Sequence, residues 1–188
     1  SVKALVNDKT CAIILEPLQG EGGINLATQE FMEGIRKICD ENGILMICDE
    51  VQCGMGRTGN MFAWQGFGVK PDILTMAKAI GNGIPVGAFA MTEEVAKYSL
   101  QPGDHGATYG GNPLACTAVK KVIEIFERDD YMSKIRHIEQ ISRQEMENFS
   151  DPRIKEVRIM GGCTCVEVHD PKTLEGFQQF AYERGVFC

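Results

Sequence analysis

Four short apolar runs, separated by turns and by segments of helical periodicity, constrain the fold of this chain more than any other feature. The runs occupy residues 11–17, 44–49, 73–77 and 86–91, and the first should be buried on both faces. Thr28 is a suitable N-cap, and Asn42-Gly43 a suitable exit, for a helix whose apolar face comprises Phe31, Ile35, Ile38 and Cys39. Because strands linked by helices pair in parallel, the pattern predicts an α/β fold with a mainly parallel, covered sheet.

The second half of the chain has a different pattern. Asn112 is a suitable N-cap and Pro113 stands at the first helical position, and apolar side chains then recur every four residues to 126, which predicts a long, well-buried helix. Three further elements are expected: a superficial helix at 131–149, β structure at 154–168 and a helix at 172–183. These elements predict a second, smaller α+β domain.

Charge and composition disfavour several classes of function. The 188 residues include 19 basic and 26 acidic side chains, and the net charge of −7 is spread along the chain, which disfavours nucleic acid and anionic membrane surfaces as partners. No apolar run approaches the roughly 18 residues of a membrane span, and residues 1–4 resemble neither a signal nor a transit peptide. Eight cysteines form no C-x-x-C pair, as suits a reducing compartment. We therefore expect a cytoplasmic protein that acts on a small metabolite.

A glycine-rich turn at residues 54–59 matches G-x-G-x-x-G directly after the second apolar run. A dinucleotide-binding turn would open a long helix, but Gly66, Gly68 and Pro71 interrupt the segment after this turn, and Asp72 comes too early for the ribose-binding acid. The three histidines lack the spacing of metal ligands, and the chain has no G-x-x-x-x-G-K-[ST] motif. We therefore expect no Rossmann site, no nucleoside triphosphate site and no metal.

One carboxylate and one lysine follow apolar runs where charged groups are uncommon. Asp49 ends the second run and Lys78 follows the third, so in a parallel sheet both lie near the carboxyl edge, where α/β folds bind ligands. A half-buried lysine loses hydration as an ammonium ion, which makes its amine a usable nucleophile for imine formation. A carboxylate facing it suits a cofactor with a cationic ring nitrogen, and pyridoxal phosphate meets that description. Taken alone, the two residues are more simply explained as a solvent-reaching lysine and a turn-capping aspartate.

Ordered blocks of the chain resemble those of the class III pyridoxal-phosphate aminotransferases. They include Asp49-Glu50-Val51-Gln52 and stand, in the family's order, at residues 16–23, 49–52, 54–59, 71–73, 77–83 and 105–115. Within the class, residues 83–88 and 102–106 are most similar to acetylornithine aminotransferase. The ornithine, 4-aminobutyrate and diaminobutyrate aminotransferases remain alternatives.

The resemblance implies a transaminase of arginine biosynthesis. It would move the ω-amino group of N-acetylornithine, or of a similar ω-amine, to 2-oxoglutarate by a ping-pong mechanism. Lys78 would form an aldimine with pyridoxal phosphate and later move a proton between the substrate carbon and C4′ of the cofactor. Asp49 would pair with the pyridine nitrogen and keep it protonated, so that the ring withdraws electrons from the substrate.

The same resemblance implies supporting roles for four more residues. Val51 would pack on the ring, and Gln52 would bond its phenolic oxygen. Thr108 would donate to the phosphate of the cofactor in the partner subunit, which implies a homodimer, and Glu21 resembles an acid that gates a substrate-binding arginine. Outside these blocks, Gln52 and Thr108 would be interpreted as ordinary turn residues. Four more polar residues are expected only to fix loops: Glu50, Arg57, His105 and Tyr109.

The resemblance covers essentially the whole chain, but members of the family are typically much longer. The expected fold is part of the fold-type I large domain at 1–111, a connecting helix and its successor at 112–150, and an incomplete small α+β domain at 151–188. The chain has no counterpart of the family's phosphate-binding turn, of the aromatic residue stacked on the ring, or of the C-terminal arginine that binds a substrate carboxylate. We therefore expect an inactive fragment of an enzyme; the alternative is a non-catalytic folding or assembly unit.

Overall fold

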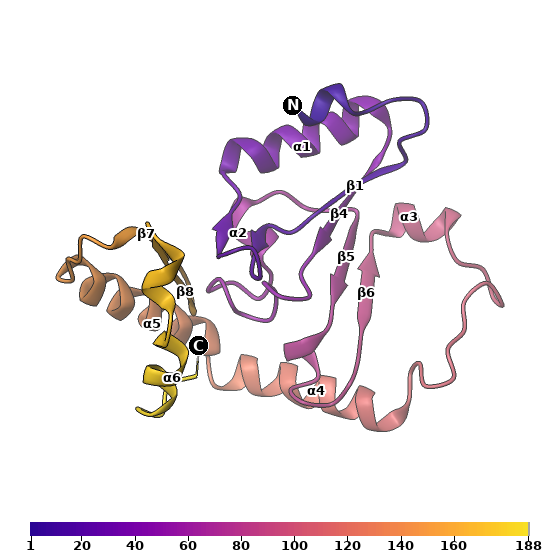
Figure 1. Ribbon diagram of the computed structural model, residues 1–188. Helices are drawn as coiled ribbons and strands as arrows, with labels where there is room; N and C mark the ends of the chain where they lie inside the picture. Colours follow the sequence, from indigo (N-terminus) through magenta and orange to yellow (C-terminus); the bar gives the residue numbers. More distant parts are fainter. Residues whose placement is uncertain (188) are drawn as a thin grey trace.

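A four-stranded sheet lies at the centre of the computed structural model, which describes residues 1–187 (Figure 1). Its strand order is β1, β4, β5 and β6, with bounds Ala12–Leu15, Leu45–Asp49, Ile73–Met76 and Ala88–Met91. β1, β4 and β5 pair in parallel, whereas β6 pairs antiparallel to β5. The predicted α/β fold with a mainly parallel sheet is confirmed, and its last strand runs against the others.

The predicted helix between the first two apolar runs is α1 (Gln29–Asn42). It begins where the Thr28 hydroxyl accepts a hydrogen bond from the Phe31 N–H at 3.1 Å, and it ends at Gly43, whose φ of 63° is the left-handed C-cap conformation. Phe31, expected on the buried face, is 44% exposed. The buried stripe includes the predicted Ile35 and Cys39, but Met32 takes the place of Phe31 in the first turn.

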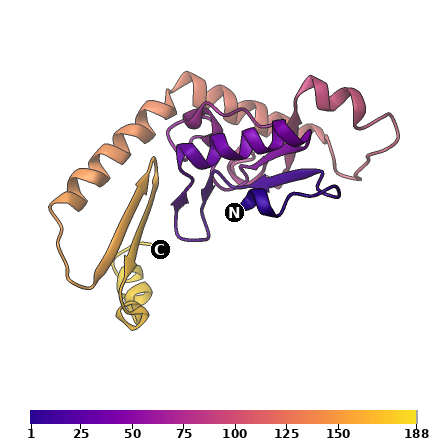
Figure 2. The same cartoon turned by 90° about the horizontal axis from the view of Figure 1, so that it is seen from above.

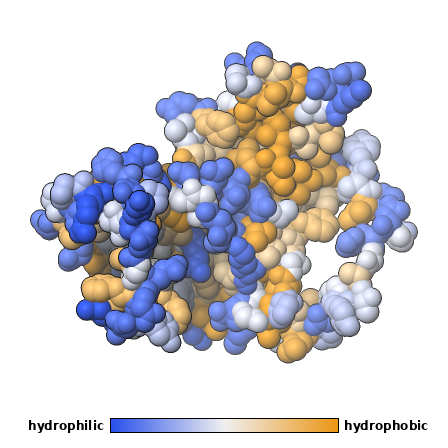
Figure 3. Space-filling view, in the orientation of Figure 1, coloured by the Kyte–Doolittle hydropathy of each residue, from blue (hydrophilic) through white to orange (hydrophobic). Residues whose placement is uncertain are grey.

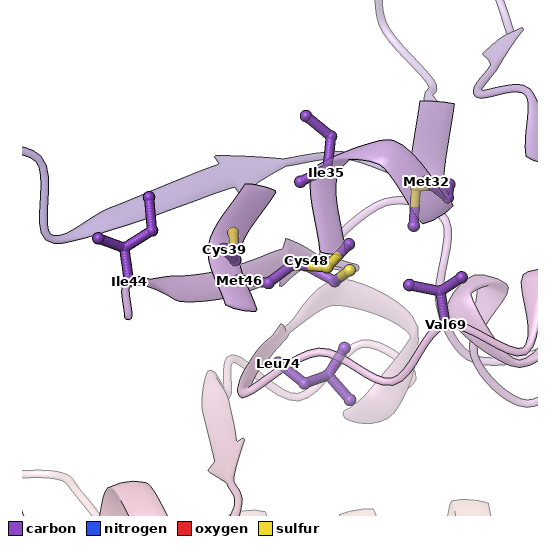
Figure 4. Packing of buried hydrophobic residues seen from close by; sticks show 8 residues of the cluster. All are labelled: Met32, Ile35, Cys39, Ile44, Met46, Cys48, Val69 and Leu74. Atoms are coloured by element: carbon purple, nitrogen blue, oxygen red, sulfur yellow. The ribbon is translucent and has the colours of Figure 1, made fainter. Parts of the chain in front are cut away.

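The main core lies between α1 and one face of the sheet. Its eight buried side chains are shown in Figure 4: Met32, Ile35, Cys39, Ile44, Met46, Cys48, Val69 and Leu74. The other face is open, since Ile14 on β1 is 63% exposed and Phe89 on β6 is 47% exposed, and Figure 3 shows hydrophobic side chains gathered over the sheet. The expectation that the first strand is buried on both faces is wrong, because α1 covers only one of them.

Short elements complete the N-terminal part of the structure. They are η1 (Val2–Ala4), β2 (Leu18–Gln19), β3 (Asn25–Leu26), α2 (Ala63–Phe67), η2 (Lys78–Ile80) and α3 (Glu93–Tyr98). β2 and β3 form a separate antiparallel pair directly after β1. This pair brings the turn at residues 20–24 close to the carboxyl edge of the sheet.

The C-terminal part begins with α4 (Pro113–Arg128), which starts as predicted because the Asn112 side chain accepts a hydrogen bond from the Ala115 N–H at 2.9 Å. The elements after it are α5 (Tyr131–Glu147), β7 (Ile154–Met160), β8 (Cys163–Val168), η3 (Pro171–Leu174) and α6 (Phe177–Tyr182). β7 and β8 form the predicted β structure, in which they pair antiparallel, beside α5 (Figure 2). Within residues 1–187, every helix is too short or too polar to span a bilayer.

Two expectations for this part need correction. α4 is not well buried: only Ala115 and Val122 are buried, and Leu114 is 69% exposed. One side of its apolar stripe meets η2 and α5, and the other side lines a cavity together with residues 85–88. The helix expected at 172–183 is divided into η3 and α6, because the chain leaves the helical conformation at Glu175 (ψ 124°) and Gly176 (φ 75°).

The C-terminal part docks on the glycine-rich turn at residues 54–59. On α5, Arg136 Nη1 donates to the carbonyl of Gly59 at 2.6 Å. Between β7 and β8, the Gly162 N–H donates to the carbonyl of Arg57 at 2.9 Å. The turn is therefore a packing surface within the fold.

Glu50 fixes the loop that follows β4, as expected. Its side chain is almost fully buried, and its two carboxylate oxygens accept hydrogen bonds from the N–H groups of Ala63 at 2.6 Å and Trp64 at 2.9 Å. These N–H groups belong to the first turn of α2, where no earlier carbonyl is available to them. Burial raises the pKa of Glu50 above its ordinary value of 4.5, although the two backbone donors oppose the shift.

The close approach at Gly161 leads to a first prediction. A Cβ at this position would lie 2.2 Å from the carbonyl oxygen of Arg57, and the backbone φ is +57°. We expect Gly161→Ala to lower the free energy of unfolding by about 2 kcal/mol or more, because the clash and the strained φ add together. Urea denaturation measures this change. Gly162→Ala is the matched control, since its Cβ would meet only Ile135 at 4.0 Å; equal losses in the two variants would contradict the prediction.

A second prediction concerns the pH dependence of stability through Glu50. Because the folded state raises its pKa, the folded protein holds a proton that the unfolded chain has released, so its contribution to stability is full at low pH and declines as pH rises through the folded-state pKa. Glu50→Gln removes this titration and one of the two acceptors, at a cost of about 1 to 3 kcal/mol. We expect the stability difference between wild type and Glu50→Gln to shrink as pH rises from about 4.5 to 7.5. A difference that grows with pH in urea denaturation would show that the folded state favours the ionised carboxylate.

Candidate active site

Asp49 lies at the carboxyl end of β4, directly opposite Thr75 on β5. Its Oδ1 accepts hydrogen bonds from the Thr75 hydroxyl at 3.1 Å and from the Val51 N–H at 3.0 Å. Within residues 1–187, Oδ2 accepts no hydrogen bond. One carboxylate oxygen is therefore fixed by the protein, and the other is available to a ligand.

Lys78 follows β5 and opens η2 at the same edge of the sheet. Its φ is +48°, in the left-handed region that an L-residue with a side chain rarely adopts, and such strain persists where the surrounding structure enforces it. The side chain is exposed, not half-buried as expected from the sequence. It lines an open depression of about 410 Å³, together with Arg57, Asn82 and their neighbours.

Gln52 connects Lys78 with the turn that carries Glu21. Lys78 Nζ contacts Gln52 Oε1, and Gln52 Nε2 donates to Glu21 Oε1 at the long distance of 3.5 Å. The turn approaches Gln52 closely, because a Cβ on Gly20 would lie 2.3 Å from Gln52 Cγ. Glycine at position 20 is therefore needed for this approach.

Arg158 ties this turn to the C-terminal hairpin. From β7, its Nε donates to the carbonyl of Gly23 at 2.8 Å, and its guanidinium also pairs with Glu156 and Glu167. The hydrogen bonds to these carboxylates raise the pKa of Arg158, which keeps it charged. The position of Glu21 therefore depends on a contact with residues more than a hundred positions away in the sequence.

The structure thus brings five of the six predicted site residues to one edge of the sheet: Glu21, Asp49, Val51, Gln52 and Lys78. Thr108 is apart from them. It belongs to the segment 100–111 between α3 and α4, in which every residue is exposed, and within residues 1–187 its side chain has no hydrogen bond to the other five. Figure 1 shows this segment extending away from the carboxyl ends of β4 and β5.

A cavity larger than the depression at Lys78 lies elsewhere. It measures about 870 Å³ and lies between residues 85–88, residues 109–112 and the apolar side of α4. Neither Asp49 nor Lys78 lines it. This cavity is therefore separate from the two residues with the relevant chemistry.

Two residues of the site were not recognised in the sequence: Thr75 and Gly20. Thr75 is the only hydroxyl residue in the apolar run of β5, and its place in the register opposite Asp49 is the signal that could have identified it. The role of Gly20 depends on the path of Gln52, a contact between residues distant in sequence that no local pattern reveals.

This arrangement can support imine chemistry. A primary amine on Lys78 and a carboxylate on Asp49 stand at the ends of adjacent parallel strands, where an amine can attack a carbonyl carbon while the carboxylate pairs with a cation on the same ligand. The Gln52 amide beside the amine supplies a further hydrogen-bonding group.

Known proteins with similar sequences and folds agree with this chemistry. The chain matches the family model of the class III aminotransferases over residues 1–188. It is 49% identical over 169 residues to the acetylornithine aminotransferase of Methanocaldococcus jannaschii, an alignment that covers 86% of this chain and 41% of that protein. The chain thus spans about two fifths of the length of this relative.

Two solved structures share the fold. Ornithine delta-aminotransferase of Plasmodium falciparum superposes with a TM-score of 0.87 at 28% identity, covering 99% of this chain and 50% of that one. Taurine:2-oxoglutarate aminotransferase of Bifidobacterium kashiwanohense, solved in complex with PLP and glutamate, superposes with a TM-score of 0.86 at 31% identity, covering 94% and 44% of the two chains. The chain belongs to the class III aminotransferases.

Proposed function

We propose that the full-length protein is a transaminase that moves the ω-amino group of N-acetylornithine, or of a similar ω-amine, to 2-oxoglutarate by a ping-pong mechanism. The observation that carries the proposal is the meeting of Lys78, Gln52 and Asp49 at one edge of the sheet. The similarity to an acetylornithine aminotransferase supports the choice of amino donor. Such an activity belongs to arginine biosynthesis.

The cofactor of this family is pyridoxal 5′-phosphate, and the residues described above fit it. Asp49 Oδ2 is free to pair with a protonated ring nitrogen, the Lys78 amine is exposed to a ligand carbonyl, and Gln52 presents an amide beside that amine. When bound, the cofactor supplies an electron-poor ring that stabilises negative charge on the substrate carbon. The protein groups then have only to hold and orient the cofactor and the substrate and to move protons.

We assign two of these tasks to the charged pair. Lys78 would hold the cofactor through its amine, and the same amine, when free, would be the group that moves a proton between the substrate carbon and C4′ of the cofactor. Asp49 Oδ2 would accept a hydrogen bond from the protonated ring nitrogen and keep it charged. The strain at Lys78 favours this role, because a left-handed φ at a functional residue persists only where its geometry is enforced.

Val51 and Gln52 orient the ring. Val51 is half-buried next to Asp49 and offers an apolar side chain for the ring face, while the Gln52 amide would donate to the phenolic oxygen. The contact between Gln52 and Lys78 means that the same amide also restrains the amine. Glu21, joined to Gln52 at 3.5 Å, is assigned the role of the acid that gates a substrate-binding arginine.

Thr108 completes the site in a homodimer. Its segment is fully exposed and lies apart from the other five residues, so it is available to donate to the phosphate of the cofactor held by the partner subunit. The proposed division of the chain is a large-domain part at 1–111, the connecting helices at 112–150 and a small-domain part at 151–188. We place the protein in the cytoplasm, which the free thiols of the described cysteines support.

The amino donor is tested with the full-length protein loaded with pyridoxal phosphate and offered N-acetylornithine, ornithine, 4-aminobutyrate and diaminobutyrate in turn, with 2-oxoglutarate as acceptor. The fold similarity to an ornithine aminotransferase makes ornithine the second candidate. Highest kcat/KM for N-acetylornithine supports the proposal. Failure of every donor, together with failure to bind the cofactor, would favour the non-catalytic assembly unit.

The third prediction tests the assignment of Lys78. Borohydride reduction should fix the cofactor covalently on the peptide that contains Lys78, and Lys78→Ala should abolish this label, because the Lys78 amine is the one that contacts Gln52 at the edge of the sheet. Mass spectrometry of the digested protein provides the measurement. Lys37→Ala is the matched control, since Lys37 is 74% exposed on α1 and should leave the label unchanged. An undiminished label on another peptide would exclude Lys78.

The fourth prediction tests Asp49. Removing the partner of a buried charge costs about 3 to 5 kcal/mol, so Asp49→Ala should slow proton abstraction in a single turnover by about two to four orders of magnitude. Stopped-flow absorbance of the bound cofactor measures the rate. Asp8→Ala, in an exposed loop, is the control. A rate for Asp49→Ala within a few-fold of wild type would rule out the role.

A further inference from the structure

We propose that Thr75 is a positioning residue that holds the Asp49 carboxylate in the orientation needed to pair with the ring nitrogen of the cofactor. The inference rests on the proposed function, because Thr75 has this role only if Asp49 pairs with the ring nitrogen. It is carried by the hydrogen bond of 3.1 Å from the Thr75 hydroxyl to Asp49 Oδ1.

The register of the sheet sets this contact. Asp49 and Thr75 are direct partners in the parallel pairing of β4 with β5, and the next N–H along, that of Glu50, donates to the Thr75 carbonyl at 3.1 Å. Thr75 also pairs with Phe89 on β6, so its backbone is held by the strands on both sides of β5. The hydroxyl is presented from a strand in the middle of the sheet, not from a loop.

The side chain of Thr75 is itself conformationally restricted. A β-branched residue in a strand has few χ1 orientations, so the direction of the hydroxyl follows from the backbone. Thr75 and Asp49 are both half-buried. Their neighbours toward the start of each strand are Cys48 and Leu74, both buried, which cannot substitute as strong hydrogen-bond donors to the carboxylate.

The two donors to Asp49 act on the same oxygen. With the Val51 N–H at 3.0 Å and the Thr75 hydroxyl at 3.1 Å, Oδ1 is engaged from the loop side and from the neighbouring strand. A carboxylate fixed at one oxygen by two donors cannot rotate without breaking one of them. Oδ2 is thereby directed away from both donors and left for the ligand.

Loss of the hydroxyl should therefore affect orientation rather than folding. With Val51 as the only donor, the carboxylate can rotate, and Oδ2 spends less time in line with the ring nitrogen. We expect Thr75→Val to lower kcat about ten-fold, as for the loss of a hydrogen bond to a charged group, with KM for the amino donor within about two-fold of wild type. Thr75→Ser keeps the hydroxyl and should recover most of the loss.

The experiment uses the full-length protein loaded with pyridoxal phosphate labelled with ¹⁵N at the ring nitrogen. In Thr75→Val, the ¹⁵N resonance should move toward the position of the unprotonated ring, and in Thr75→Ser it should return toward the wild-type position. Thr75→Ala lacks the hydroxyl as well and repeats the test with a different side-chain shape. Thr164→Val, at an exposed strand position on β8, is the matched control and should change neither the resonance nor kcat.

Two results would overturn the inference. Wild-type resonance and kcat in both hydroxyl-free variants would show that Val51 alone suffices to orient Asp49, and an equal loss in Thr75→Ser and Thr75→Val would show that side-chain shape, not the hydroxyl, matters. The proposed function is tested separately, by borohydride labelling at Lys78 and by amino transfer in the wild-type protein. If those fail, the function is wrong; if they succeed and the Thr75 variants behave like wild type, only the role of Thr75 is wrong.

Discussion

The parallel pairing of β4 with β5 is the interaction on which the rest of the site depends. It aligns Ile47, Cys48 and Asp49 with Ile73, Leu74 and Thr75, so that both strands end at the same edge of the sheet. Buried Met46, Cys48 and Leu74 hold this register through their packing under α1, because a slip by one residue would turn the apolar side chains outward. The polar groups that follow the two strands meet only because the core fixes the register.

The polar edge is then completed by contacts from distant parts of the chain. Glu50 joins the end of β4 to the first turn of α2 through two backbone N–H groups, and Arg158 joins the C-terminal hairpin to the turn that carries Glu21. Both side chains stabilise loops whose backbone would otherwise lack partners. The site is therefore coupled to the docking of the C-terminal part, which Gly161 permits by its close approach to Arg57.

Local chemistry explains what could be predicted from the sequence. The ends of α1 follow from Thr28 and Gly43, since capping needs only neighbouring residues, and the shared edge of Asp49 and Lys78 follows from the parallel order of the apolar runs. Exposure could not be predicted in the same way, because it depends on which element covers a side chain. Phe31 on α1, the outer face of β1 and Lys78 are all more exposed than expected. The contact of Thr75 with Asp49 likewise depends on register, which a single strand pattern does not define.

Lys78 shows how the core determines the geometry of a reactive group. Its left-handed φ is unfavourable by itself, yet the residues after it are held firmly: Ile80 is 4% exposed in a cluster with Met55 and Val122, and the Gly81 N–H donates to the Lys78 carbonyl at 3.1 Å. Relaxing φ would pull Ile80 out of this cluster and would cost more than the strain itself, which is of order 1 to 3 kcal/mol. Packing between η2 and α4 therefore holds the backbone of Lys78 at the sheet edge, while its exposed side chain remains free to reach a ligand.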